Sequence, residues 1–203
     1  MLVPVGRLLR RLRQPRSRAD EVRALRRRLR VERARTVDDD ERQLAAALAA
    51  GKRDLSQAVG AVDACGRCAT GRPWPLGAHD GGACCAGTTA ELFDDAELAA
   101  LAHAGTRPGD LTPPAGAEPH AGCAFRGAHS CSLDLAHRPA RCVRYLCDTI
   151  RAELHRRGRL DTIELHLATV DDLARRFAAA HRQRLDREVL APIIAALEAA
   201  VRR

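Results

Sequence analysis

Eight cysteines are the residues of this chain best suited to chemistry, because thiolates are preferred ligands of zinc and of iron-sulfur clusters. Glycine and small or loop-forming residues separate many of them, so the backbone is able to bring the sulfurs together. A bound metal can also order a segment that has too few apolar residues to fold unaided. We therefore expect zinc or iron as the cofactor, with these ligands: Cys65, Cys68, Cys84, Cys85, Cys123, Cys131, Cys142 and Cys147.

The spacing Cys65-Gly-Arg-Cys68 is typical of a metal knuckle, in which two sulfurs bind one ion and backbone amides stabilise their charge. A thioredoxin-like redox motif has the same spacing, but with a strand before it and a helix after it. Here an expected helix precedes the motif and a loop follows, which favours the metal interpretation. Eight thiols suffice for two four-cysteine sites, or for one cluster with four thiols left over. Four histidines are further candidate ligands, although surface positions are the simpler interpretation: His79, His120, His129 and His137.

The charge of the chain is concentrated at its N-terminus. Residues 1–35 contain 13 arginines and three acidic residues, a net charge of +10, whereas the whole chain carries +8. The remaining residues therefore have a net charge of −2 and no basic face that composition reveals, which weakens a nucleic-acid-binding interpretation. We find no apolar run long enough for a signal peptide or membrane span and expect a cytoplasmic protein. In that reducing compartment the cysteines are metal ligands rather than disulfides, and export would make four disulfides the competing explanation.

The fold class expected from composition is mainly α, since five aromatic residues leave burial to Leu, Val, Ile and Ala. We expect a small helical domain wrapped around a loop-rich cysteine cluster. Residues 1–18 form a flexible basic arm and 19–62 form N-terminal helices. Residues 63–158 form the metal-binding domain, and 159–203 form C-terminal helices that pack on the N-terminal ones.

Individual helices are expected from caps and from apolar spacing. Asp38 and Glu41 form a capping-box pattern that opens a helix, and Asp94 and Glu97 form another. The apolar stripe of the first helix is Leu44, Leu48, Leu55, Val59 and Val62, and a shorter helix before it carries Val22, Leu25 and Leu29.

Residues after Pro139 show helical spacing up to Gly158, and this constrains two thiols. In one regular helix Cys142 and Cys147 would lie about 140° apart, so both serve one centre only if Cys142 precedes the helix or lies in a distorted first turn. Further on, Asp161 and Thr169 are expected to cap two segments, with a short strand at 163–167 as the alternative. Pro192 is expected to begin a last helix.

The cysteine pattern resembles the zinc- or iron-chelating cysteine-cluster family, also called CxxCxxCC or YkgJ-like, over roughly residues 65 to 147. In that family a dense cysteine knot is followed by a helix and by a segment with Cys-x-x-Leu and Arg-Pro-x-x-Cys-Arg. The resemblance assigns the first four cysteines to the knot. It assigns the other four, with Arg138 and Pro139, to the second segment, and so implies that all eight are metal ligands.

Departures from the family pattern are confined to a few places. Fifteen residues, 69–83, separate Cys68 from Cys84 where the family has two or three, and Leu133 and Val143 replace the usual aromatic and arginine. From the residues themselves, Arg138 is expected either to neutralise thiolate charge or, as we favour, to make a structural hydrogen bond to the loop, and Tyr145 is expected to lie in the core.

Three functions remain open from the sequence. The first is a metal-binding protein whose centre is structural or redox-active. The second is an iron-sulfur-dependent group-transfer enzyme distantly like flagellin lysine N-methylases, which contain a similar cysteine segment, with a thiol such as Cys85 or an open ligand position for the chemistry. The third and weakest is a nucleic-acid-binding protein with a structural zinc knot.

Overall fold

The structure is a computed structural model that describes residues 18–62, 89–114, 123–126 and 131–201. It is mainly helical, and its described part contains no strand. The helices are α2 (Arg18–Ala34), α3 (Asp39–Val59), α5 (Thr89–Leu92), α6 (Asp95–His103), α7 (Ala140–Arg144), α8 (Asp148–Arg156) and α9 (Leu160–Val201), and two 3-10 turns are η2 (Pro108–Asp110) and η3 (Leu135–His137). The expected arm at 1–17 and the loop at 63–88 lie outside the described residues.

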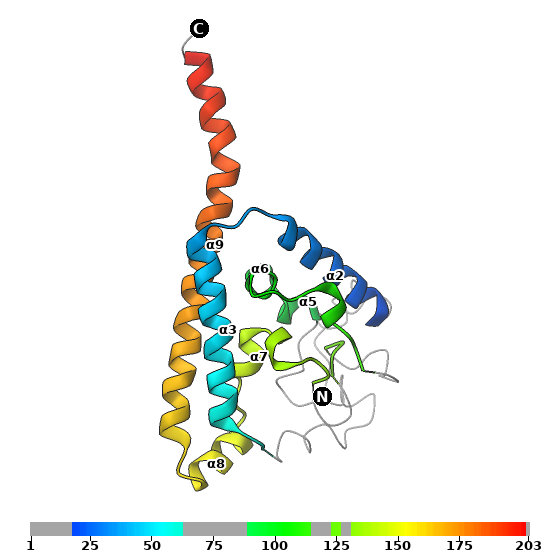
Figure 1. The fold of residues 1–203 in the computed structure, drawn as a ribbon, viewed down its shortest axis with the longest axis vertical. Coiled ribbons are helices and arrows are strands. Elements are labelled where there is room, and N and C mark those ends of the chain that lie inside the picture. The colour runs from blue at the N-terminus through cyan, green and yellow to red at the C-terminus, as the bar shows by residue number, and fades with distance from the viewer. Residues whose placement is uncertain (1–17, 63–88, 115–122, 127–130, 202–203) are drawn as a thin grey trace, which may run out of the picture.

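Helices α3 and α9 lie side by side and run antiparallel (Figure 1). The carboxylate of Asp38 accepts a hydrogen bond from the Glu41 amide and begins α3 as expected. Leu48 and Leu55 from the predicted stripe are buried against α9. The helices approach closely at Gly51, where an added Cβ would lie 3.4 Å from a Leu173 methyl carbon.

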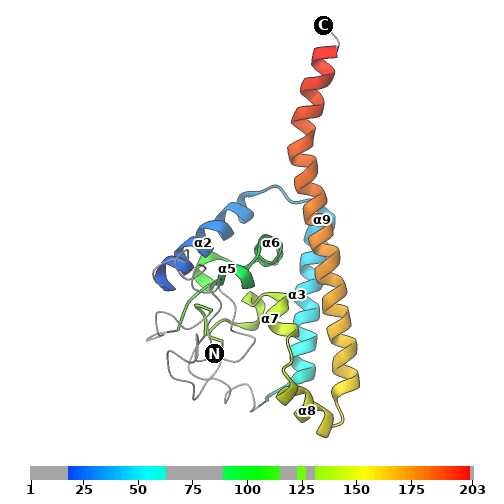
Figure 2. The same cartoon turned by 180° about the vertical axis from the view of Figure 1, so that it is seen from behind.

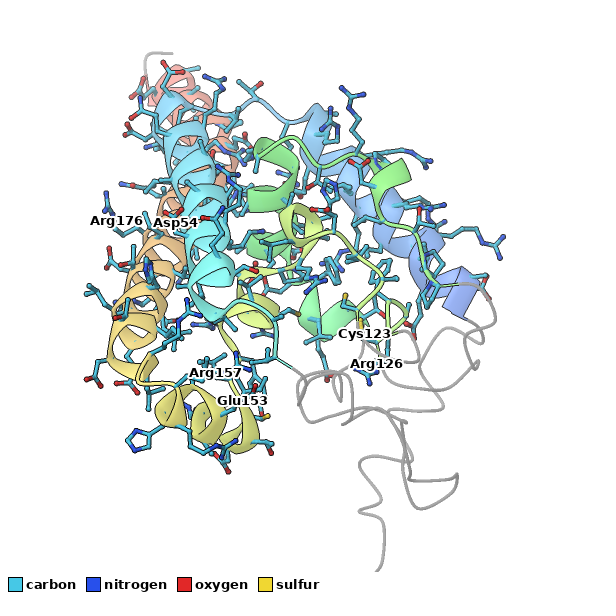
Figure 3. The ribbon with its side chains drawn as sticks, turned by 60° about the horizontal axis from the view of Figure 1, so that its bottom comes forward. Asp54, Cys123, Arg126, Glu153, Arg157 and Arg176 are labelled. Atoms are coloured by element: carbon cyan, nitrogen blue, oxygen red, sulfur yellow. The ribbon has the colours of Figure 1, made fainter. Side chains whose placement is uncertain are left out.

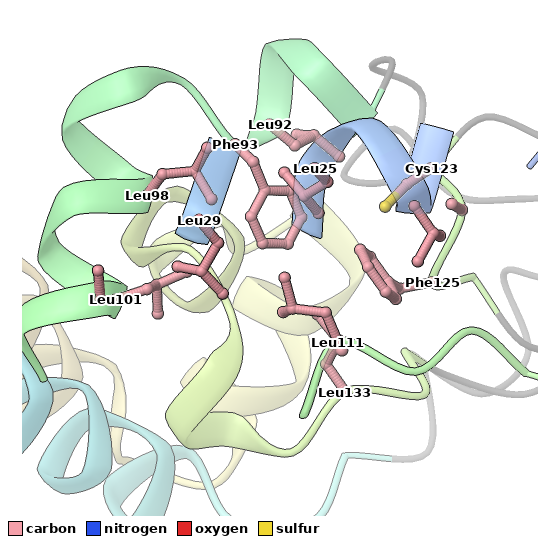
Figure 4. Packing of buried hydrophobic residues seen from close by; sticks show 13 residues of the cluster. Leu25, Leu29, Leu92, Phe93, Leu98, Leu101, Leu111, Cys123, Phe125 and Leu133 are labelled. Carbon is pink, nitrogen blue, oxygen red and sulfur yellow. The ribbon is translucent and has the colours of Figure 1, made fainter. Parts of the chain in front are cut away.

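A second apolar cluster lies between α2, α5, α6 and the loops that follow α6 (Figure 4). Val22, Leu25 and Leu29 supply one face of α2, as their spacing predicts. The rings of Phe93 and Phe125 meet at a centroid distance of 5.4 Å. This cluster matters for the site because it connects α2 and α6 to the segment that begins at Cys123.

The helical spacing after Pro139 is divided between α7 and α8, so Cys142 precedes the helix that carries Ile150 and Leu154, which is one of the two arrangements that the spacing left open. Tyr145 ends α7 in an extended conformation, and Cys147 is the residue before the first turn of α8. Ile150 and Leu154 of α8 pack on the α3–α9 cluster, which Ala140 and Val143 of α7 also join. Tyr145 is 44% exposed, so the expectation that its ring lies in the core is wrong.

Helix α9 is continuous where separate segments or a strand were expected. Ile163, Leu167 and Val170 are buried at spacings of four and three, while Leu165 is 70% exposed, so a helical and not an alternating period is realised. The Thr169 hydroxyl donates to the Leu165 carbonyl within the helix and caps nothing.

Pro192 lies inside α9 and does not begin a helix. Beyond Glu188 the helix extends past the body of the molecule (Figures 1 and 2). The apolar residues there were expected to pack on the N-terminal helices, but they are exposed: Val189, Leu190, Ile193, Ile194 and Leu197. In the described ranges no helix combines the length and apolar character needed to cross a membrane.

Candidate metal centre

The expected metal ligands divide into two groups of four. Cys65, Cys68, Cys84 and Cys85 lie outside the described residues, as do three of the four candidate histidines, His79, His120 and His129. The other four cysteines lie in described segments, and three of them contact one apolar cluster: Cys123, which is 6% exposed, and the partly buried Cys131 and Cys142.

Backbone hydrogen bonds hold Cys123 and Cys131 in a small hairpin-like arrangement. Arg126 and Cys131 form an antiparallel β-bridge, and the Ser132 amide donates to the Phe125 carbonyl at 2.8 Å. The Arg126 amide donates to the Cys123 carbonyl at 3.1 Å, which makes a tight turn. Arg126 is only 5% exposed and lies beside Cys123 (Figure 3). A buried arginine thus follows Cys123 by three residues and pairs with Cys131 through the backbone.

Two buried charged side chains hold the segment that precedes Cys142. From α3, the Lys52 Nζ donates to the carbonyls of Ala136 at 3.3 Å and Arg138 at 2.7 Å. From α6, the Glu97 carboxylate accepts hydrogen bonds from the amides of Ala140 at 2.8 Å and Arg141 at 3.1 Å, which begin α7. Lys52 thus binds the end of η3 and Glu97 binds the start of α7, so residues 136–141 are held from both sides.

Lys52 and Glu97 form a clamp on residues 136–141. Burial shifts the pKa of each in the direction that favours its neutral form. Desolvation lowers the pKa of Lys52 from its usual 10.5 to about 8, although the charges of Glu97 and Cys142 oppose that shift. Desolvation likewise raises the pKa of Glu97, against the two backbone hydrogen bonds that favour its carboxylate. The clamp therefore places an ammonium group close enough to Cys142 for their charges to interact.

Arg138 and His137 have structural contacts within the same segment. The Arg138 Nε donates to the Leu133 carbonyl at 2.9 Å, which confirms the expected structural hydrogen bond. His137 is partly buried rather than a plain surface residue, and its Nδ1 lies 3.0 Å from the Thr106 hydroxyl. These bonds hold η3 against the turn that follows α6.

Cys147 lies apart from the other three described cysteines, because it packs against the α3–α9 cluster. Among the residues that the structure describes, one group of three or more metal-binding side chains has ligand atoms all within 4.8 Å of one another, and it contains no cysteine. Its members are Glu41, His103 and His181. Within the described residues, three sulfurs therefore contact one apolar cluster without forming such a group among themselves.

The group at Glu41 is a candidate site that sequence reasoning missed. Glu41 was expected to complete a capping box, yet its side chain is fully buried and meets α9 instead. Glu97, the matching residue of α6, also turns away from its own helix start. The available signal was that both capping patterns place a glutamate on the helix face that carries the apolar stripe.

No protein-family model, curated protein or solved structure matches this chain.

Proposed function

We propose that this protein binds zinc or iron through its cysteines and that the centre has a structural or redox role. The observation that carries the proposal is that Cys123, Cys131 and Cys142, from three separate positions of the chain, pack against one apolar cluster. An iron-sulfur cluster is included, since thiolates serve both kinds of centre. The four cysteines of residues 65–85 complete the proposed ligand set.

The electrostatic surroundings support thiolate ligands at this place. Thiolates are stabilised by nearby positive charge, and the buried Arg126 bonds through its backbone to Cys123 and forms a β-bridge with Cys131. The charge of Lys52 interacts with that of Cys142. Positive groups from two different elements thus accompany the three thiols, which offsets the repulsion among thiolates gathered around one ion.

The clamp formed by Lys52 and Glu97 supports a positioned ligand at Cys142. Two buried charges are costly unless they are paired and hydrogen-bonded, and here both bind the backbone within six residues before Cys142. Such an arrangement gives the Cys142 thiol a fixed place relative to α3 and α6. A metal ligand benefits from that preorganisation.

Single replacement of Cys123, Cys131 or Cys142 by serine tests the proposal. Each variant should contain less zinc or iron than the parent after anaerobic purification, because a hydroxyl is a poorer ligand than a thiolate for these metals. Limited proteolysis should also cut residues 105–147 more readily. Circular dichroism should keep most of the helical signal, since the α3–α9 core holds none of these three residues.

The matched control is Ser132→Ala, which changes the same hairpin without removing a thiol. It should keep the metal content of the parent. Three cysteine variants with full metal content and unchanged protease resistance would refute the proposal.

A further inference from the structure

A second group of metal-binding side chains lies where α3 begins, α6 ends and α9 passes both helices. Glu41 comes from the first turn of α3, His103 is the last residue of α6, and His181 lies in α9. One ligand atom from each lies within 4.8 Å of the other two. The three residues are nitrogen and oxygen donors, so this group differs in chemistry from the cysteines.

Two imidazole nitrogens in this group are buried and lack a hydrogen-bond partner among the described residues. They are the Nε2 atoms of His103 and His181, and His181 as a whole is only 4% exposed. An unsatisfied buried polar atom costs about 1–3 kcal/mol. A metal ion is a partner that an imidazole nitrogen accepts readily.

Neighbouring side chains set the orientation of the ligands. The His181 Nδ1 lies 2.8 Å from the Glu41 carboxylate, so Nδ1, and not Nε2, is the His181 atom on the side of Glu41. Phe177 stacks on His181 at a centroid distance of 5.9 Å and lies 6.2 Å from the His103 ring. Because Phe177 is 1% exposed, both imidazoles are held against a fixed apolar surface.

Arg184 is the neighbour that opposes a cation, and two carboxylates offset it. Its guanidinium donates to Glu41 and to Glu188 and lies 3.2 Å from the His181 Nδ1, so an ion bound between Glu41 and His181 requires the guanidinium to move away. Glu41, Arg184 and Glu188 together carry a formal charge of −1. Arg42 also acts on His103, but it is paired with Asp39. Burial lowers the pKa of His103, which keeps its imidazole in the neutral form that binds metals.

We propose that Glu41, His103 and His181 form a binding site for a divalent transition metal such as zinc. Two histidines and one glutamate are a known zinc ligand set. Zinc bonds of about 2.0–2.2 Å require the ligand atoms to move to roughly 3.3 Å from one another. Binding therefore draws together α3, α6 and α9, whether or not the cysteines hold a metal.

Cobalt(II) titration of the full-length protein tests this site separately from the cysteine centre. Cobalt on thiolates gives strong near-ultraviolet charge-transfer bands, whereas cobalt on imidazole and carboxylate gives only weak visible bands. His103→Leu and His103→Gln should each lose one equivalent of bound cobalt and the weak visible bands, with the charge-transfer bands unchanged. Zinc should raise the melting temperature of the parent more than that of either variant.

Two features of this experiment make its outcome decisive. His155→Leu is the matched control, because His155 is exposed on α8 and should behave as the parent does. The two replacements at His103 differ in polarity, so a folding defect in one leaves the other to decide. Equal cobalt stoichiometry, spectra and zinc-dependent melting in the parent and both His103 variants would overturn the proposal. Loss of charge-transfer bands in cysteine variants alone would bear only on the cysteine centre.

Discussion

Replacing Lys52 with methionine should change how stability depends on pH above neutrality. Lys52 is 3% exposed, and burial lowers its pKa from 10.5 to about 8. Between these values the unfolded chain holds a proton that the folded chain has lost. The free energy of unfolding of the parent therefore rises as pH rises from about 8 to 10.5, and this contribution is absent below that window.

The size of this effect follows from the shift in pKa. One pKa unit corresponds to about 1.4 kcal/mol, so Lys52 should add about 3 kcal/mol to the free energy of unfolding across the window. Methionine lacks that titration. Near pH 7 the replacement also leaves the carbonyls of Ala136 and Arg138 without their donor, at about 1–3 kcal/mol each. At pH 7 the loss of these hydrogen bonds is offset by the removal of a buried charge, so the free energies of unfolding of variant and parent should differ little. At pH 10 the parent's Lys52 is neutral, so only the loss remains and the variant's free energy of unfolding should fall below the parent's.

Urea unfolding at a series of pH values between 7 and 10.5 measures the effect directly. Arg53→Met is the matched control, because Arg53 is the exposed neighbour of Lys52 and its replacement leaves the hydrogen bonds of Lys52 in place. Since the charge of Arg53 also lowers the pKa of Lys52, this variant should keep the rise in stability over a somewhat narrower pH window. Subtracting the Lys52→Met curve from that of the parent removes the titration of thiols that both share. Parallel curves for the parent and the Lys52 variant would refute the reasoning.

Three further replacements test the clamp, the core and the extension of α9. Burial raises the pKa of Glu97, so the parent should lose stability as pH rises from 4.5 through the raised value, and Glu97→Gln should abolish that fall in urea unfolding between pH 4 and 7. Leu55→Ala should cost about 2–5 kcal/mol because Leu55 is fully buried, and a loss under about 1 kcal/mol would contradict its core position. Leu190→Gln should change the free energy of unfolding by less than about 0.5 kcal/mol, since Leu190 is half exposed on the extension of α9.

Local signals predicted the helix starts well, because capping is decided by neighbouring residues. Asp38 and Asp94 each accept a hydrogen bond from the amide three residues on, as their patterns predicted. The glutamates of the same patterns were predicted less well. Glu41 and Glu97 bond to groups 140 and 43 residues away along the chain, and such partners leave no mark in a local pattern.

Apolar spacing predicted the faces of helices but not their ends. The break between Arg144 and Asp148 lies within a run of suitable helical spacing. Long-range contacts hold both sides of it, because Glu97 binds the amides that begin α7 and Ile150 of α8 packs on the α3–α9 core. Conversely, Pro192 indicated a helix start and instead lies inside α9.

The candidate site was predicted only as a set of residue types. Cysteine content pointed to metal binding, but spacing did not reveal that Cys123, Cys131 and Cys142 pack on one cluster while Cys147 packs on another. That division depends on the break before Cys147. Residue spacing could not predict the group formed by Glu41, His103 and His181, because its three members come from separate helices.

X-ray absorption of protein isolated anaerobically, combined with elemental analysis, tests the central proposal most directly. The proposal predicts at least about one zinc or iron per chain, with sulfur neighbours at about 2.3 Å from the metal. Less than about one metal per chain, or a metal surrounded only by nitrogen and oxygen, would contradict it.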